Sequence, residues 1–177
     1  MSKNSLRLHK IVFLSLLLGS AMPAEAAIES KYNFNVTPEK LCSYLDLPDP
    51  STYKPLVYPE NPQYSCGTAY MYIERTGGVE LDNNLAYYVI GTASKAEQLK
   101  LVLNMNQPEK SKHAHAALLK YAGQLLEKTL SQKIPVELKA AIISGQSKTA
   151  LLNGHTLEVT KEEWNTGRGY NLTFIIK

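Results

Sequence analysis

The chain has 177 residues, of which 44% are hydrophobic and 20% charged, with 19 Lys and Arg against 16 Asp and Glu. This composition is typical of one ordinary globular domain, and it excludes collagen-like, low-complexity and wholly disordered chains. A multi-pass membrane protein is excluded as well, because a single apolar run stands out where such a protein needs several.

The first 26 residues predict a secretory signal peptide. A positively charged region, an apolar run and small residues at a cleavage site follow one another, as such a signal requires. These parts are Lys3, Arg7 and Lys10, then 11–18, then Ala24-Glu25-Ala26. The run is shorter than the roughly 20 apolar residues of a bilayer-spanning helix, and no Cys stands at its end to carry a lipid. We expect cleavage after Ala26 or Ala27 and a periplasmic or secreted product with no stable membrane anchor.

Removal of residues 1–26 leaves a nearly neutral chain. Residues 27–177 hold 16 basic and 15 acidic residues, a net charge of +1. Nucleic acid and anionic lipid are bound through concentrated basic patches, so we expect neither as a partner. The segment 27–177 is long enough to bury one hydrophobic core, and it is predicted to be a single domain.

Cys42 and Cys66 are the two cysteines of the chain. Export to an oxidising compartment predicts that they form a disulfide, which stabilises the fold by roughly 3.5 kcal/mol in the chain-entropy model. Their wide spacing does not favour a redox function, which is typical of Cys-x-x-Cys. Two cysteines and scattered histidines do not complete a four-ligand zinc set, so we predict no metal and no cofactor.

The hydrophobic pattern predicts an α+β domain in the block order α-βββ-αα-βββ. Period-two alternation marks the strands, and apolar residues at three- and four-residue steps mark the helices. Together they predict an antiparallel sheet of about six strands with a helical hairpin packed on one face. The expected helices are 37–47, 109–131 and 135–145, and the expected strands are 68–74, 85–92, 99–105, 149–152, 155–160 and 170–176. Asn153-Gly154 predicts a tight hairpin turn, because both positions tolerate a positive φ.

The sequence carries no recognisable catalytic motif. It lacks a Gly-x-Ser-x-Gly elbow, a His-Glu-x-x-His pair and a Gly-rich phosphate loop. His113 and His115 lie about 200° apart around the expected helix, which disfavours a shared metal. We expect both, and His155 beside the Asn-Gly turn, to be exposed. The pattern therefore does not favour an enzyme, although it leaves that class open.

The segment 164–170 carries residue types that are frequent at protein-binding hot spots. It combines Trp164, the only Trp of the chain, with Arg168 between two glycines and with Tyr170. We name these three as candidate binding residues at a chain reversal. The alternative is a plain hairpin loop, in which Trp164 packs into the core and Arg168 meets solvent.

The proline-rich segment 48–64 is the second candidate surface. It has five prolines, which deny it a regular ladder of N–H donors and predict an irregular loop. Tyr53 and Tyr58 lie between the prolines and Tyr64 follows the last of them. Tyrosine offers a large contact area at low entropic cost. The alternative is that these tyrosines anchor the loop onto the domain.

Export, fold class and the lack of catalytic motifs predict a non-enzymatic periplasmic protein that binds another protein. An inhibitor or immunity protein against a secreted toxin fits this prediction, as does an accessory subunit of an envelope or secretion complex. The alternative is a small hydrolase or small-ligand carrier with a pocket between sheet and helices. A structural part of the envelope is a third interpretation.

Overall fold

The computed structural model describes residues 34, 36–56, 63–75, 77 and 81–177. The predicted signal peptide and Tyr58 lie outside these ranges. Within them, no helix is both long enough and apolar enough to cross a membrane.

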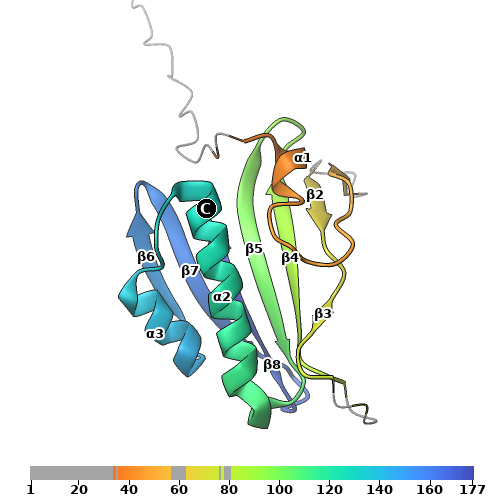
Figure 1. The fold of residues 1–177 in the computed structure, drawn as a ribbon, viewed down its shortest axis with the longest axis vertical. Coiled ribbons are helices and arrows are strands. Elements are labelled where there is room, and N and C mark those ends of the chain that lie inside the picture. The colour runs from red at the N-terminus through yellow and green to blue at the C-terminus, as the bar shows by residue number, and fades with distance from the viewer. Residues whose placement is uncertain (1–33, 35, 57–62, 76, 78–80) are drawn as a thin grey trace, which may run out of the picture.

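In the described residues, one antiparallel sheet of eight strands forms the body of the fold (Figure 1). The strands follow the order β1-β2-β4-β5-β8-β7-β6, and β3 also pairs with β4. They are β1 (Lys54–Pro55), β2 (Tyr64–Gly67), β3 (Met71–Tyr72), β4 (Asn84–Gly91), β5 (Ala96–Met105), β6 (Lys148–Leu152), β7 (His155–Glu163) and β8 (Tyr170–Ile176). The predicted α+β class and antiparallel sheet are therefore confirmed, whereas the expected count of about six strands is not.

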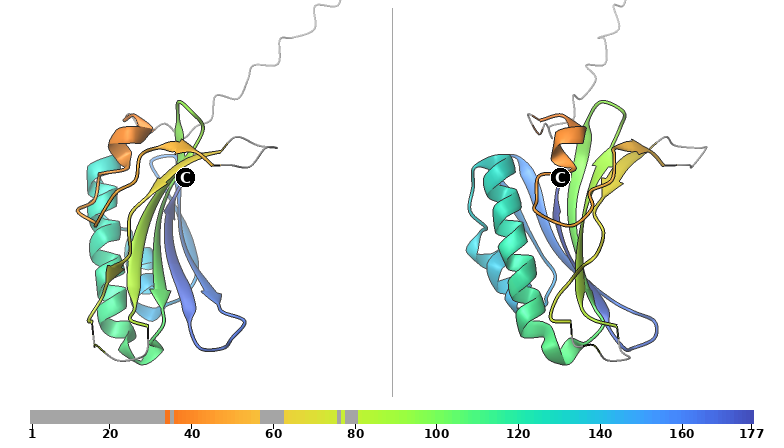
Figure 2. Two further views of the ribbon diagram at one scale, coloured as in Figure 1. Left: turned by 90° about the vertical axis from the view of Figure 1, so that its right-hand side faces the viewer. Right: turned by 45° about the vertical axis from the view of Figure 1, so that its right-hand side comes forward.

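The described helices lie on one side of this sheet and leave its other face open (Figure 2). They are α1 (Pro38–Leu41), the short 3-10 turn η1 (Pro108–Lys110), α2 (Ser111–Leu130) and α3 (Val136–Ser144). The predicted helical hairpin is not confirmed as such. α2 has 20 residues and packs over β5, whereas α3 has nine and packs over β6 and β7. Gly145 ends α3 with a φ of 65°, a left-handed conformation that glycine adopts without strain.

The core lies between the helices and the apolar face of the three central strands. Leu101 of β5 stands opposite Tyr87 of β4 and Phe174 of β8, and all three side chains are buried. The rest of this row obeys the same period of two, since alternate residues of a strand point to the same face. The row also includes Leu85, Val89, Leu99, Leu103, Leu172 and Ile176. From the helix side, Leu118, Leu125 and Leu126 are fully buried against it.

The strand expected over 68–74 is interrupted. Gly67 pairs with Tyr88, and Met71 pairs with Leu85. Between these two pairs the segment from β2 to β3 advances by four residues, whereas β4 advances by three. Such an extra residue breaks the ladder like a β-bulge. At the break, the N–H of Ala69 donates to the carbonyl of Pro48 at 2.9 Å, outside the sheet. The segment 48–64 is not wholly irregular either, because it includes β1 and the first residue of β2.

The hairpin of β6 and β7 forms as predicted. Asn153 and Gly154 have φ angles of 50° and 85°, the positive values that a tight two-residue turn requires. Leu152 pairs with His155 across it. β7 extends to Glu163, three residues past the predicted end, because its last residues pair with the first residues of β8.

The predicted disulfide between Cys42 and Cys66 is present, with a Cα–Cα distance of 5.9 Å. Cys42 follows α1, and Cys66 lies in β2. A helix of four residues is not stable by itself. The bridge therefore holds α1 against β2 of the sheet.

Replacing both Cys42 and Cys66 with Ala is expected to lower the free energy of unfolding by about 3.5 kcal/mol, because the unfolded chain without the bridge regains loop entropy. Urea titration followed by circular dichroism measures this difference. Treating the wild type with a thiol reductant should give the same loss, and an unchanged midpoint in both experiments would contradict the assigned role of the bridge.

Replacing Tyr87 with Phe is expected to leave stability unchanged or raise it by up to about 1 kcal/mol. The Tyr87 hydroxyl is buried without a hydrogen-bond partner among the described residues, and an unpaired buried hydroxyl is costly. Tyr53→Phe is the matched control, because it removes the 2.8 Å bond to the Thr92 carbonyl and should destabilise slightly. Thermal unfolding compares the two, and a larger loss for Tyr87→Phe would overturn the prediction.

Candidate functional site

The segment 164–170 is a closed turn between β7 and β8. The N–H of Trp164 donates to the carbonyl of Gly169 at 3.0 Å, and the N–H of Gly167 donates to the carbonyl of Trp164 at 2.8 Å. Gly167 has a φ of 65°, in the left-handed region that favours glycine. The chain reversal predicted at Gly167-Arg168-Gly169 is therefore present, with a fixed backbone.

Trp164 is half-buried and held on two sides. Its indole Nε1–H donates to the Oδ1 of Asn171 at 3.0 Å. Its ring lies directly over Gly169, since a Cβ at that position would come within 2.6 Å of ring carbon Cζ3. Trp164 therefore neither enters the core nor stands free in solvent, and its orientation is set by the turn.

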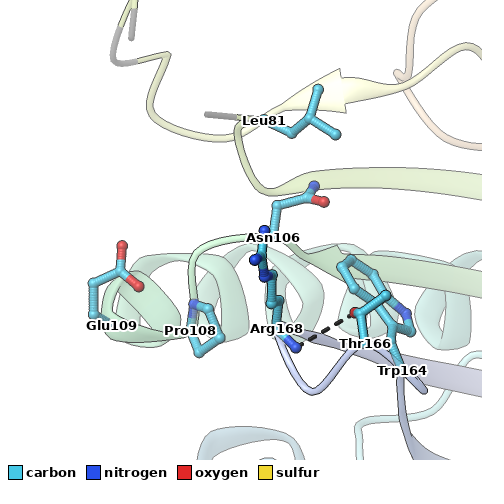
Figure 3. Close-up of a pocket in the computed structure, with 7 residues that line it drawn as sticks. All are labelled: Leu81, Asn106, Pro108, Glu109, Trp164, Thr166 and Arg168. Atoms are coloured by element: carbon cyan, nitrogen blue, oxygen red, sulfur yellow. Dashed lines mark hydrogen bonds between the residues drawn. The ribbon is translucent and has the colours of Figure 1, made fainter. Parts of the chain in front are cut away.

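One edge of the Trp164 ring borders an open cleft of about 890 Å³ at the end of the sheet (Figure 3). We call it the Trp164 cleft. Three separate parts of the chain meet there: the segment just before β4, the segment after β5, and the 164–170 turn. The lining residues are Leu81, Asn106, Pro108, Glu109, Trp164, Thr166 and Arg168.

Arg168 extends across this cleft toward Asn106 (Figure 3). Its backbone N–H donates to Thr166 Oγ1 at 3.4 Å, which helps hold the residue at the turn. Among the described residues, no carboxylate pairs with its guanidinium. Leu81 on the opposite wall is 71% exposed. Within the described part of the chain, an unpaired cation and an uncovered apolar side chain therefore face the same open space.

A buried amide pair joins two walls of the cleft. The Nδ2 of Asn83 donates to the backbone carbonyl of Gln107 at 3.1 Å, and the Gln107 N–H donates to Asn83 Oδ1 at 2.8 Å. The Gln107 Nε2 donates to the carbonyl of Leu81 at 3.2 Å. Both side chains are 3% exposed, so these bonds are shielded from water and fix Leu81 relative to the end of β5.

Sequence reasoning misses this amide pair. The local pattern places Asn83 in a turn and Gln107 near the end of a strand, with no link between them. The signal in the sequence that could have indicated the pair is the concentration of Asn and Gln at the start of one expected strand and at the end of the next. Their pairing in the sheet, with Asn84 opposite Asn104, brings the two groups together.

Tyr170 does not line the cleft. It is 8% exposed and lies on the helix-covered face, opposite Met105. The Nε2 of His115 lies 2.9 Å from the Tyr170 hydroxyl, and His115 Nδ1 lies 3.0 Å from the carbonyl of Ile143. Because a carbonyl only accepts, Nδ1 carries a proton and donates to Ile143. Tyr170 thus links β8 to both long helices.

The expectation that His115 and His155 are exposed is wrong. Their exposed fractions are 5% and 8%, because His115 points under α3 and His155 stacks on Phe34 at 5.4 Å between ring centroids. His113 is exposed and contacts the carboxylate of Glu74. The prediction that the two helical histidines face different directions is correct.

Tyr53 and Tyr64 lie at the opposite end of β4 from the Trp164 cleft. Tyr64 pairs with Gly91 at one end, whereas Asn84 begins β4 beside the cleft. The Tyr53 hydroxyl donates to the carbonyl of Thr92, and the Tyr53 and Tyr64 rings lie 5.8 Å apart. Burial is the main cause that raises the pKa of Tyr53 to about 12. These contacts favour the anchoring interpretation, and the two candidate segments do not form one surface.

The space between sheet and helices is filled by large side chains. Tyr87, Phe174, Met105 and Leu118 are among the residues there with less than 2% exposure. In the described ranges, no three His, Cys, Asp or Glu side chains gather into a group that could hold a metal ion. The lining of the Trp164 cleft offers one cation, one carboxylate, amide and hydroxyl groups, and apolar surface. This set can bind a ligand, but its described residues include no activated nucleophile.

Comparison with known proteins assigns no family to the chain. No protein-family model matches the chain, and neither the curated proteins nor the solved structures give a match.

Replacing Asn171 with Ala is expected to free the Trp164 indole and destabilise the fold by about 1 kcal/mol, the usual value for one lost hydrogen bond. Because Trp164 is the only Trp, the fluorescence of the protein reports directly on the exposure of this indole. Its emission should move to longer wavelength, and acrylamide should quench it more strongly. Asn165→Ala, an exposed change in the same turn, is the control and should leave the spectrum unaltered. An unshifted spectrum for Asn171→Ala would contradict the fixed orientation of the ring.

Proposed function

We propose that residues 27–177 form an exported, non-enzymatic protein that binds another protein through the Trp164 cleft. The observation that carries this proposal is the Arg168 guanidinium, which has no acidic partner among the described residues and stands beside a fixed Trp ring and an exposed Leu. Trp and Arg are the residue types most enriched at binding hot spots. The exposed guanidinium makes no described ion pair that would stabilise the free domain.

The rigidity of the site supports the same proposal. The turn is closed by two backbone hydrogen bonds, and the opposite wall is held by the buried pair of Asn83 and Gln107. A preformed site loses little conformational entropy on binding, so more of the contact energy appears as affinity. The lining combines apolar side chains with charged and polar ones, as protein interfaces commonly do.

The proposed location is the periplasm or the extracellular space. The charge and hydropathy pattern of residues 1–26 supports export, and the disulfide is compatible with an oxidising compartment. The partner classes that suit such a protein are a secreted toxin, for an inhibitor or immunity protein, and an envelope or secretion complex, for an accessory subunit. Nothing in the described core favours the hydrolase or carrier, because large side chains fill the space where its pocket is expected.

Site-specific photo-crosslinking in intact cells tests the proposal. A photoreactive amino acid at Thr166, which is exposed and lines the cleft, is expected to give one discrete adduct of higher mass. The same amino acid at Lys54, exposed in β1 at the far end of the sheet, serves as the matched control and should give none.

Arg168→Glu introduced beside the photoreactive residue should abolish the adduct, since it reverses the charge that faces the partner. Circular dichroism is expected to show an unchanged fold, because Arg168 is exposed and its side chain has no described partner. Equal adducts from Thr166 and Lys54, or no adduct from either, would overturn the proposal.

A further inference from the structure

We infer that the Trp164 cleft recognises an acidic segment of its protein partner, in which a carboxylate pairs with Arg168 and a neighbouring aliphatic side chain covers Trp164 and Leu81. This inference rests on the proposed function and names the chemistry of the partner. It goes beyond a general binding surface, because it commits to the sign of the charge and to the apolar neighbour.

The carboxylate follows from the guanidinium. Arg168 is the one cationic side chain among the described residues that line the cleft, and in the described ranges it has no acidic partner of its own. The nearby Glu163 of β7 is already paired with Lys161. An arginine presents parallel N–H groups that fit the two oxygens of a carboxylate. Charge complementarity therefore selects an acidic group at this position.

The aliphatic neighbour follows from the surroundings of Arg168. In Figure 3 its side chain lies between Pro108 on one side and the Trp164 ring on the other, with Leu81 across the opening. An apolar group that covers Leu81 removes one of the most exposed large hydrophobic side chains, at 71%, from water. It also excludes water from the ion pair, and a charge interaction strengthens when water is excluded.

Glu109 places a negative charge at one end of the cleft. It lies beyond Pro108, on the far side from Trp164 (Figure 3). A second carboxylate of the partner would be repelled there, whereas a neutral or basic residue would not, and repulsion of this kind contributes to specificity. The same carboxylate disfavours a polyanion such as nucleic acid, which needs several neutralising cations along its backbone.

A peptide selection tests this inference even though the partner is unidentified. The immobilised domain 27–177 is panned against a displayed library of random 12-residue peptides that lack Trp. We expect enrichment of peptides with Asp or Glu within a few positions of Leu, Ile or Val. Panning the Arg168→Glu variant should lose these peptides, whereas Lys54→Glu, the same charge change at an exposed site on β1, should retain them.

Binding of a selected peptide is then measured by the fluorescence of Trp164. Arg168→Glu should weaken the affinity by roughly tenfold or more, and Arg168→Lys by a smaller factor, because Lys lacks the paired donors. Raising the salt concentration should weaken binding, as expected for a partly exposed ion pair. Amidation of the peptide's acidic side chain should have the same effect as Arg168→Glu.

The outcomes separate the inference from the proposed function. Selected peptides that shift Trp164 emission but lack acidic residues, or that bind Arg168→Glu equally well, would overturn the acidic partner and leave the cleft as a protein-binding site. Peptides that bind without any change in Trp164 emission, or no enrichment over an unrelated protein, would overturn both.

Discussion

The pairing of β5 with β8 is the contact on which the rest of the structure depends. It joins seven residue pairs between strands that lie on either side of α2, α3 and the β6–β7 hairpin in the sequence. Buried apolar side chains, such as Leu101 and Phe174, meet across it on the helix-covered face. Without this long-range pairing, the strands would form two smaller sheets, and each would leave part of its apolar face without the neighbouring strands that a stable sheet needs.

The same pairing creates the candidate site. The last residues of β5 stand opposite the first residues of β8, with Met105 facing Tyr170. The 164–170 turn, which leads into β8, is thereby brought beside the segment that follows β5. The backbone carbonyl of Met105 approaches Gly169 so closely that a Cβ there would lie 2.2 Å from it. Glycine is therefore required at that position for the turn to reach the sheet.

The domain divides its polar groups between two different roles. Asn83, Gln107, His115 and Tyr170 are buried and use their hydrogen bonds to join elements of the fold. Buried polar groups of this kind favour one arrangement over others, because each would be costly if left unpaired. Arg168, in contrast, is exposed, and no described carboxylate pairs with its guanidinium at the end of the sheet. The first set therefore supports the fold, and the exposed guanidinium supports the proposal that Arg168 binds a partner.

The sequence by itself determined the features that depend on neighbouring residues. Period-two patterns located β4, β5 and β8, the Asn153-Gly154 pair specified its turn, and the expectation of export predicted the bridge between Cys42 and Cys66. Tertiary structure decided which strand ends meet. It placed Leu81, Asn106 and Glu109 in the cleft, buried His115 and Tyr170, and set Tyr53 and Tyr64 at the opposite end of the sheet. Local patterns indicate which face of its own strand or helix a side chain occupies. A site built from distant strands depends also on which strands pair and in which register, and the local pattern does not specify that pairing.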